Sequence, residues 1–285
     1  MKSAVGDPPP GSFLARNEFL IRRLHSLSGM IPVGAYMVVH LLTNASVLDS
    51  PGRFQRFVYD IHSLPLLWVI EWTFIFLPIL FHAIVGVLII RGGLPNSGTY
   101  RYGSNYRYTL QRASGMIAFM FIMVHVFHMH GWFHFDWWVR NVVEPLGGGQ
   151  FKPFNAASTG AAALASVGYQ IFYLVGVLAC VFHLANGIWT FGITWGVWVT
   201  PQAQRWATRA CLAFGLVLGA ISLGVLGGFA YLVDPQKARE VEKTQYDAKI
   251  ASGELDEEVA KHKRAKSPAP APAATETASA PNSDP

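Results

Sequence analysis

The sequence predicts an all-α integral membrane protein with five transmembrane helices. Of its 285 residues, 52% are apolar and only 14% are charged, whereas about a quarter of the residues in an average soluble domain are charged. Apolar stretches long enough to cross a bilayer recur five times, and the basic residues collect in alternate loops. This composition excludes a soluble enzyme of average surface and a disordered chain.

Each apolar stretch has close to, or more than, the about 20 residues that a helix needs to cross the hydrocarbon core of a bilayer. The predicted spans are 24–48, 66–90, 110–132, 162–189 and 207–233. Together they make one membrane domain over residues 22–233, between an amino-terminal segment, 1–21, and a carboxy-terminal tail, 234–285. In the tail, residues 235–266 mix charges of both signs and favour a short amphipathic helix, while the Pro/Ala/Ser/Thr-rich stretch 267–285 is expected to be disordered.

The basic residues predict the orientation, because loops on the cytoplasmic side of a membrane carry an excess of lysine and arginine. The amino-terminal segment, the 91–110 loop, the mouth of the third helix and the 199–209 turn hold ten of them: Lys2, Arg16, Arg22, Arg23, Arg91, Arg101, Arg107, Arg112, Arg205 and Arg209. The opposite loops hold only four: Arg53, Arg56, Arg140 and Lys152. We therefore expect the amino terminus in the cytoplasm and the carboxy terminus outside. The net charge of +5 follows from this topology, and no basic patch interleaved with aromatic residues indicates nucleic-acid binding.

The first four predicted helices carry one deeply placed histidine each, and ionisable side chains inside a membrane are costly and usually functional. At about 1.5 Å of rise per residue, His40 and His125 belong in the outer half of the membrane, and His82 and His183 in the inner half. Two pairs at two depths would ligate two haem groups, which predicts a haem-binding bundle. Iron with two axial imidazoles has no open position, which suits electron transfer.

An internal repeat accompanies these histidines. Ser28-Gly29-Met30-Ile31 precedes His40 and Ser114-Gly115-Met116-Ile117 precedes His125, with 11 and 10 residues from glycine to histidine. The second and fourth helices share the pattern Phe-His-x-x-x-Gly, which ends at Gly86 and Gly187. A glycine four residues after a histidine lies on the same helix face, so we expect these two glycines to leave space for the flat haem. The alternative is that they only let the helices pack closely.

Three further side chains and the two cysteines are less specific. Glu71 is the only carboxylate within the predicted spans, where it either carries protons near the outer face or extends to water. His128 lies one helical turn beyond His125 and faces either the same cavity or the membrane interface. His25 at the cytoplasmic end is a candidate contact for a partner subunit. Cys180 and Cys211 lack metal-binding spacing and are interpreted as packing residues.

Several segments resemble one known family over roughly residues 17–233. The chain is similar to the dihaem cytochrome b membrane-anchor subunit of succinate:menaquinone oxidoreductases and related fumarate reductases. The resemblance lies in residues 19–27, 31–34 with His40, 76–83, 110–112 with His125, 175–178, 182–183, 186–187 and 200–201. It implies a five-helix anchor in a bacterial cytoplasmic membrane and two b haems. Their ligands would be the residues at His40 with His125 and at His82 with His183.

The resemblance also implies partners and a reaction. A flavoprotein and an iron–sulfur protein would dock on the cytoplasmic face, and the anchor would exchange electrons with a quinone, menaquinone rather than ubiquinone, making it the quinone-reactive subunit of the enzyme. We expect the quinone near the outer haem, with Glu71 as proton carrier and with His128 and Trp72 as contacts. Some relatives carry an intramembrane glutamate two residues before the last haem ligand. Val181 stands there in this chain, so we do not expect the proton path of those relatives.

Two other interpretations of the sequence stay open. One is a dihaem b anchor that serves a formate dehydrogenase, a hydrogenase or a nitrate reductase. The other is a haem-free metal transporter, which the absence of carboxylates or thiolates beside the histidines disfavours. The chain shows neither a Gly-x-Gly-x-x-Gly motif nor a cysteine set for an iron–sulfur cluster. No flavin or dicarboxylate site is therefore expected on this chain.

Overall fold

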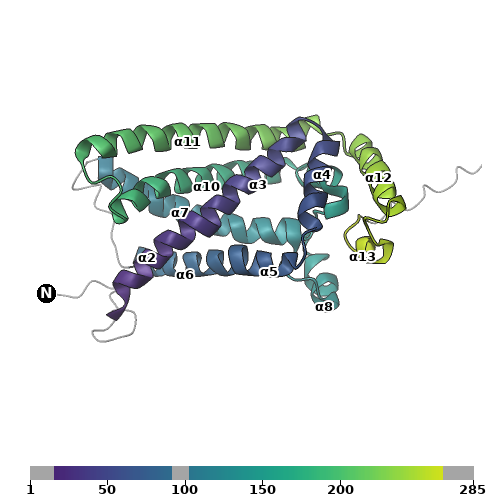
Figure 1. Ribbon diagram of the computed structural model, residues 1–285, viewed down its shortest axis with the longest axis horizontal. Helices are drawn as coiled ribbons and strands as arrows, with labels where there is room; N and C mark the ends of the chain where they lie inside the picture. The colour runs from purple at the N-terminus through teal and green to yellow at the C-terminus, as the bar shows by residue number, and fades with distance from the viewer. Residues whose placement is uncertain (1–15, 92–102, 266–285) are drawn as a thin grey trace, which may run out of the picture.

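The computed structural model describes residues 16–91 and 103–265, and every element in this part of the chain is helical (Figure 1). Five helical stretches are long and apolar enough to cross a membrane: Glu18–Leu48, Leu67–Arg91, Asn105–His130, Val167–Thr194 and Pro201–Leu232. The predicted all-α class with five transmembrane helices is thus confirmed. Three parts of the chain lie outside the described residues: most of segment 1–21, residues 92–102 with Arg101, and the stretch 267–285 that is expected to be disordered.

The spans are built from α-helices interrupted by π-helical turns. The first contains α2 (Glu18–Ser28), the π segment η1 (Gly29–Gly34), α3 (Ala35–Ala45) and η2 (Ser46–Leu48), and the second contains α5 (Leu67–Glu71), η3 (Trp72–Phe76) and α6 (Leu77–Arg91). The third is α7 (Gly103–His130), the fourth α10 (Val167–Thr194), and the fifth α11 (Pro201–Gly227) with η6 (Gly228–Leu232). Pro32 lies inside η1, where a wider turn accommodates a residue that has no N–H to donate.

Shorter helices connect the spans or follow them. They are α4 (Pro51–His62), α8 (Asp136–Trp138), η4 (Val139–Val143), η5 (Pro153–Asn155), α9 (Ala156–Ala163), α12 (Pro235–Ala251) and α13 (Glu257–Lys261). The fourth span begins at Val167 and not at 162, because the alanine-rich stretch before it forms the separate buried helix α9. The fifth begins at Pro201, where the Thr200 hydroxyl accepts a hydrogen bond from the Ala203 N–H, 3.2 Å away.

The long helices lie side by side, and their two ends differ (Figure 1). Helix α10 packs between α7 and α11, α11 also contacts α3, and α2 packs against α6. Helix α2 begins at one end of the bundle, while α4, α12 and α13 gather at the other (Figure 1). We refer to these as the α2 end and the α12 end.

A buried carboxylate fastens the carboxy-terminal segment to the α12 end. Asp234 caps α12 by accepting hydrogen bonds from the backbone N–H groups of residues 236 and 237. Within α12, the fully buried Glu242 accepts hydrogen bonds from the Ser158 N–H (2.8 Å), the Ser158 hydroxyl (2.6 Å) and the Asn155 side-chain amide (3.2 Å). Buried carboxylates require such partners. The predicted amphipathic helix therefore exists and is an integral part of the fold.

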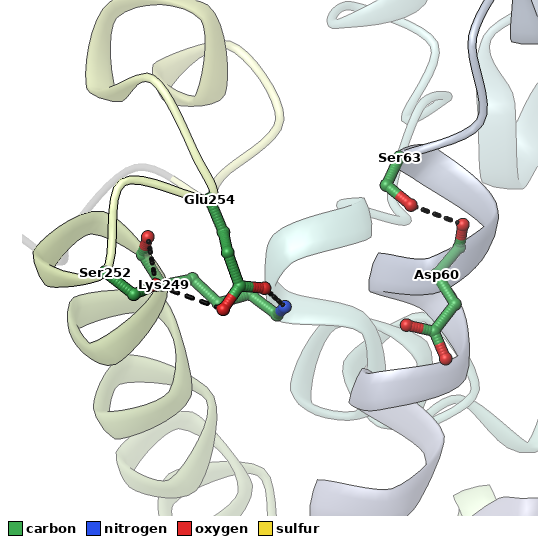
Figure 2. A network of polar contacts seen from close by, with 5 residues as sticks. All are labelled: Asp60, Ser63, Lys249, Ser252 and Glu254. Atoms are coloured by element: carbon green, nitrogen blue, oxygen red, sulfur yellow. Dashed lines mark hydrogen bonds and ion pairs between the residues drawn. The ribbon is translucent and has the colours of Figure 1, made fainter.

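Two further contacts hold this region together. The buried Gln55 of α4 donates to the Pro153 carbonyl (2.7 Å) and accepts from the Ala156 N–H (2.8 Å). Figure 2 shows the end of α12 facing the end of α4, with Lys249 held by Glu254 at 2.6 Å. The Lys249 ammonium lies 5.4 Å from the ring of Tyr59 in α4. A packed domain of polar and aromatic contacts thus closes the α12 end of the bundle.

Replacing Glu242 with alanine is expected to release α12 from the bundle, because the Ser158 backbone N–H and the Asn155 side-chain amide would stay buried without this acceptor. We expect a loss of about 3 kcal/mol of local stability, which corresponds to about 100-fold faster proteolysis of the tail. Limited proteolysis of the membrane-embedded protein measures it. Glu240→Ala, at an exposed position of the same helix, is the matched control, and equal cleavage rates in the two variants would contradict the expectation.

Candidate haem-binding site

His82 of α6 and His183 of α10 face each other near the α2 end, with ring centres 6.2 Å apart and planes at 83°. His82 is held from α2. Its Nδ1 lies 3.0 Å from the His25 carbonyl oxygen, and its ring stacks on the His25 ring at 4.0 Å and 13°. A carbonyl only accepts hydrogen bonds, so the proton of His82 lies on Nδ1. Its Nε2 is then available as a metal ligand.

His183 is held from α7 by a polar network. Its Nδ1 lies 3.1 Å from the Gln111 carbonyl oxygen, while the Gln111 side-chain amide donates to the His183 carbonyl at 3.2 Å. The Gln111 amide oxygen accepts from the Asn186 amide at 2.7 Å, and Asn186 accepts from Arg107 at 3.0 Å. The ring is therefore oriented by groups on two helices.

A second pair lies between His40 of α3 and His125 of α7, with ring centres 6.0 Å apart and planes at 76°. The Tyr173 hydroxyl of α10 lies 3.2 Å from His125 Nδ1 and 2.9 Å from His128 Nδ1. Phe121 stacks on the His125 ring at 5.4 Å and 21° and contacts the Tyr173 ring at 5.4 Å. The pair thus lies in an aromatic environment, farther from the α2 end than the first pair.

The ring-centre distances of both pairs agree with the distance expected for two imidazoles that would bind one metal. An imidazole nitrogen binds a first-row transition metal at about 2.0–2.1 Å, so two imidazoles on opposite sides of one metal hold their ring centres about 6 Å apart. The ring distances of 6.0 and 6.2 Å match this value. In the described part of the chain, no cluster of three or more His, Cys, Asp or Glu side chains could hold a metal ion. The histidines occur as pairs, and a pair suits haem, whose ring supplies the other four ligands.

Comparison with known proteins decides the family. No protein-family model matches the chain. The succinate dehydrogenase cytochrome b558 subunit of Bacillus subtilis (strain 168) is 34% identical over 212 residues, which make up 74% of this chain and 97% of that protein. The chain belongs to the succinate dehydrogenase cytochrome b family. The resemblance found in the sequence is confirmed, and the chain is a multi-pass membrane subunit of this cytochrome b type.

The other candidate residues of this cytochrome b subunit lie in different surroundings. Glu71 is half-buried where α5 meets η3, and Trp72 beside it is 44% exposed. His128 is only 3% exposed and stacks on Tyr169 at 3.9 Å. It therefore lies among aromatic side chains inside the protein and not at the interface with water. A Cβ on Gly86 would meet His25 at 3.4 Å, and one on Gly187 would meet Gln111 at 3.7 Å. Neither would have a side-chain atom of His82 or His183 within 4 Å.

Sequence reasoning missed several residues that contact the histidine pairs of this cytochrome b subunit. Tyr173 and Gln111 bind ring nitrogens, although no local pattern around them indicates it. His62 at the end of α4 was not singled out either, and it lies outside both pairs, with its ring centre 6.5 Å from that of Phe154. Burial, the charge of Lys263 and the neighbouring His130 lower the pKa of the His62 imidazole to about 4, so it is uncharged at neutral pH.

Proposed function

We propose that the chain is the membrane anchor of a succinate dehydrogenase or fumarate reductase and carries electrons through two bis-histidine b haems. The electrons would pass between a cytoplasmic iron–sulfur subunit, which itself binds a flavoprotein, and menaquinone in the membrane. One observation supports this most: four histidines from four different spans form two pairs whose ring centres lie 6.0 and 6.2 Å apart. His82 and His183 would hold the inner haem, and His40 and His125 the outer one.

In this function the protein would hold the two haems and fix the orientation of their histidines. Haem supplies one-electron chemistry when bound, and two axial histidines leave its iron without an open site. Hydrogen bonds from Nδ1 to the carbonyls of His25 and Gln111 fix the inner rings, and Tyr173 does this for His125. Such bonds also make the ligand a stronger electron donor.

The α2 end is the proposed cytoplasmic face and docking surface for the iron–sulfur subunit, with the chain in a bacterial cytoplasmic membrane. Basic and exposed apolar side chains meet there. The Arg23 guanidinium lies 5.0 Å from the Phe19 ring and 5.1 Å from the Trp195 ring, and Phe19 and Val199 are 73% and 72% exposed. Positive charge at this end agrees with the positive-inside rule. The carboxy terminus would then lie outside.

Quinone would react near the outer pair, toward the α12 end. Electrons that enter from the cytoplasm meet the inner pair first, so a second haem farther out is useful only if their destination lies there. Glu71 is the proposed proton carrier, with Trp72 at the lipid-facing rim and His128 deeper, next to Tyr173, as candidate contacts. Val181, two residues before His183, is buried and apolar, so this part of α10 offers no carboxylate for a return path.

Cross-linking on the purified complex tests both the partner and the orientation. A photoreactive residue at position 205 is expected to capture the iron–sulfur subunit, because Arg205 is exposed at the α2 end. The matched control is position 140, which is exposed near the other end and should capture no catalytic subunit. Capture at position 140 alone would show that the orientation is inverted. Co-purification of formate dehydrogenase, hydrogenase or nitrate reductase subunits would contradict the proposed complex.

A further inference from the structure

The two inner histidines rest on the same local structure, which occurs once on the first span and once on the third. In each case a backbone carbonyl accepts a hydrogen bond from Nδ1 of the histidine and another from the hydroxyl of a serine three residues later. The first site consists of the His25 carbonyl, with Ser28 at 3.0 Å, and Gly29. The second consists of the Gln111 carbonyl, with Ser114 at 3.1 Å, and Gly115. We call them the first seat and the second seat.

The glycine of each seat leaves the space in which the histidine ring lies. A Cβ on Gly29 would overlap Cε1 of His82 and lie 2.7 Å from its Nδ1. A Cβ on Gly115 would lie 2.8 Å from Cε1 and 3.1 Å from Nδ1 of His183. Contacts under 3.0 Å, which a Cβ on each glycine would make to Cε1 of its histidine, are essentially never made by a real Cβ atom. Even the smallest side chain would therefore push the ring away from the carbonyl.

The seat also selects the tautomer. In the first seat the His25 carbonyl only accepts, so the proton of His82 is kept on Nδ1 and the lone pair on Nε2. In the second seat the Gln111 carbonyl lies 3.1 Å from His183 Nδ1, and the Gln111 side-chain nitrogen, 3.2 Å from the same Nδ1, donates to the His183 carbonyl. Partners of this kind orient metal-binding histidines and raise their basicity. In both seats the serine follows the carbonyl residue by three positions and the glycine follows directly after the serine, although the side chains at 25 and 111 differ.

We propose that Gly29 and Gly115 are positioning residues for the inner haem, each forming with its carbonyl a seat that fixes one axial histidine supplied by the next span. The first two spans and the third and fourth spans are then two copies of one unit, with the seat on the first helix and the inner ligand on the second. This inference rests on the proposed haem function. It assigns the repeated Ser-Gly pair a role that a general close contact between helices does not require.

Glycine-to-alanine variants of the complete complex test the proposal. Gly29→Ala and Gly115→Ala are each expected to lower the affinity for the inner haem by about tenfold, the lower end of the usual effect when a partner of a metal-binding histidine is lost. The matched controls are Gly219→Ala and Gly227→Ala on α11, a helix that supplies none of the four histidines. A Cβ on Gly219 would meet only Val181, at 3.9 Å, and one on Gly227 would meet nothing within 4 Å. Haem content, the low-spin EPR signal and the midpoint potential of each haem are measured.

The outer haem, between His40 and His125, serves as the internal standard for folding. The proposal expects a lost or shifted inner-haem signal with the outer-haem signal unchanged in both seat variants, and two unchanged signals in the controls. An unchanged inner-haem signal in the seat variants, an equal loss of both haems, or the same loss in the controls would overturn it. A wild-type complex without haem would instead refute the proposed function, so the two failures are distinguishable.

Discussion

Alanine at His82 or at His183 is expected to reduce the haem content of the complex from two to one, with loss of the inner haem. Each side chain is one of only two protein ligands of the proposed inner site, and its partner ring lies 6.2 Å away on another helix. One imidazole alone cannot keep the iron six-coordinate and low-spin. The pyridine haemochrome assay counts the haems, and a dithionite-reduced spectrum shows which band is lost. Alanine at His40 or His125 is expected to remove the outer haem in the same way.

His134→Ala is the matched control for these variants. His134 is an exposed histidine that follows α7, and its Nε2 contacts only the His130 carbonyl among the hydrogen bonds of the described residues. It should keep both haems. Two haems in the His82→Ala protein, or one haem in the wild type, would refute the assignment of the pairs.

Glutamine at Glu71 is expected to slow quinone turnover by about 100-fold while both haem bands survive. Quinone reduction takes up protons and quinol oxidation releases them, and loss of a positioned acid or base usually costs about 10²- to 10⁴-fold in rate. Glutamine keeps the size and shape of the side chain but cannot carry a proton, so the effect separates chemistry from packing. Turnover with a water-soluble menaquinone analogue, followed by optical spectroscopy, measures it.

The control for Glu71→Gln is Glu144→Gln, which changes an exposed carboxylate outside the spans. It should turn over normally. Normal turnover of Glu71→Gln, together with a quinone-site inhibitor that perturbs only the inner haem, would place the quinone site on the cytoplasmic side. The proposed quinone site near the outer haem would then be wrong.

The membrane spans could be predicted well because they depend on a local property, the length of apolar stretches. The ring distances within the histidine pairs were not predictable. Which histidines lie opposite each other followed from helix direction and depth alone. The contacts of Glu242 are a different case. Its partners Asn155 and Ser158 lie 87 and 84 residues away, so composition indicated a helix in the tail but not the surface that it covers.

The glycines show the same limit at the site itself. Spacing along one helix directed attention to Gly86 and Gly187, because residues four apart share a face. Their role as space for haem stays a prediction. The histidine rings lie against Gly29 and Gly115 of a neighbouring helix, and contact across helices has no spacing rule in the sequence. The signal that could have found Gly29 and Gly115 was the repeat of four residues around them.

The π segment η1 keeps the two halves of the bundle in angular register. His40 follows Gly29 by 11 residues, whereas His125 follows Gly115 by 10 along the uninterrupted helix α7. In an α-helix, one extra residue would turn His40 by about 100° around the helix axis. A π turn closes its hydrogen bond one residue later, so it takes up an inserted residue without turning the remainder of the helix. The first span can therefore hold one residue more than the third between glycine and histidine, a stretch that includes Pro32, and still direct His40 toward His125.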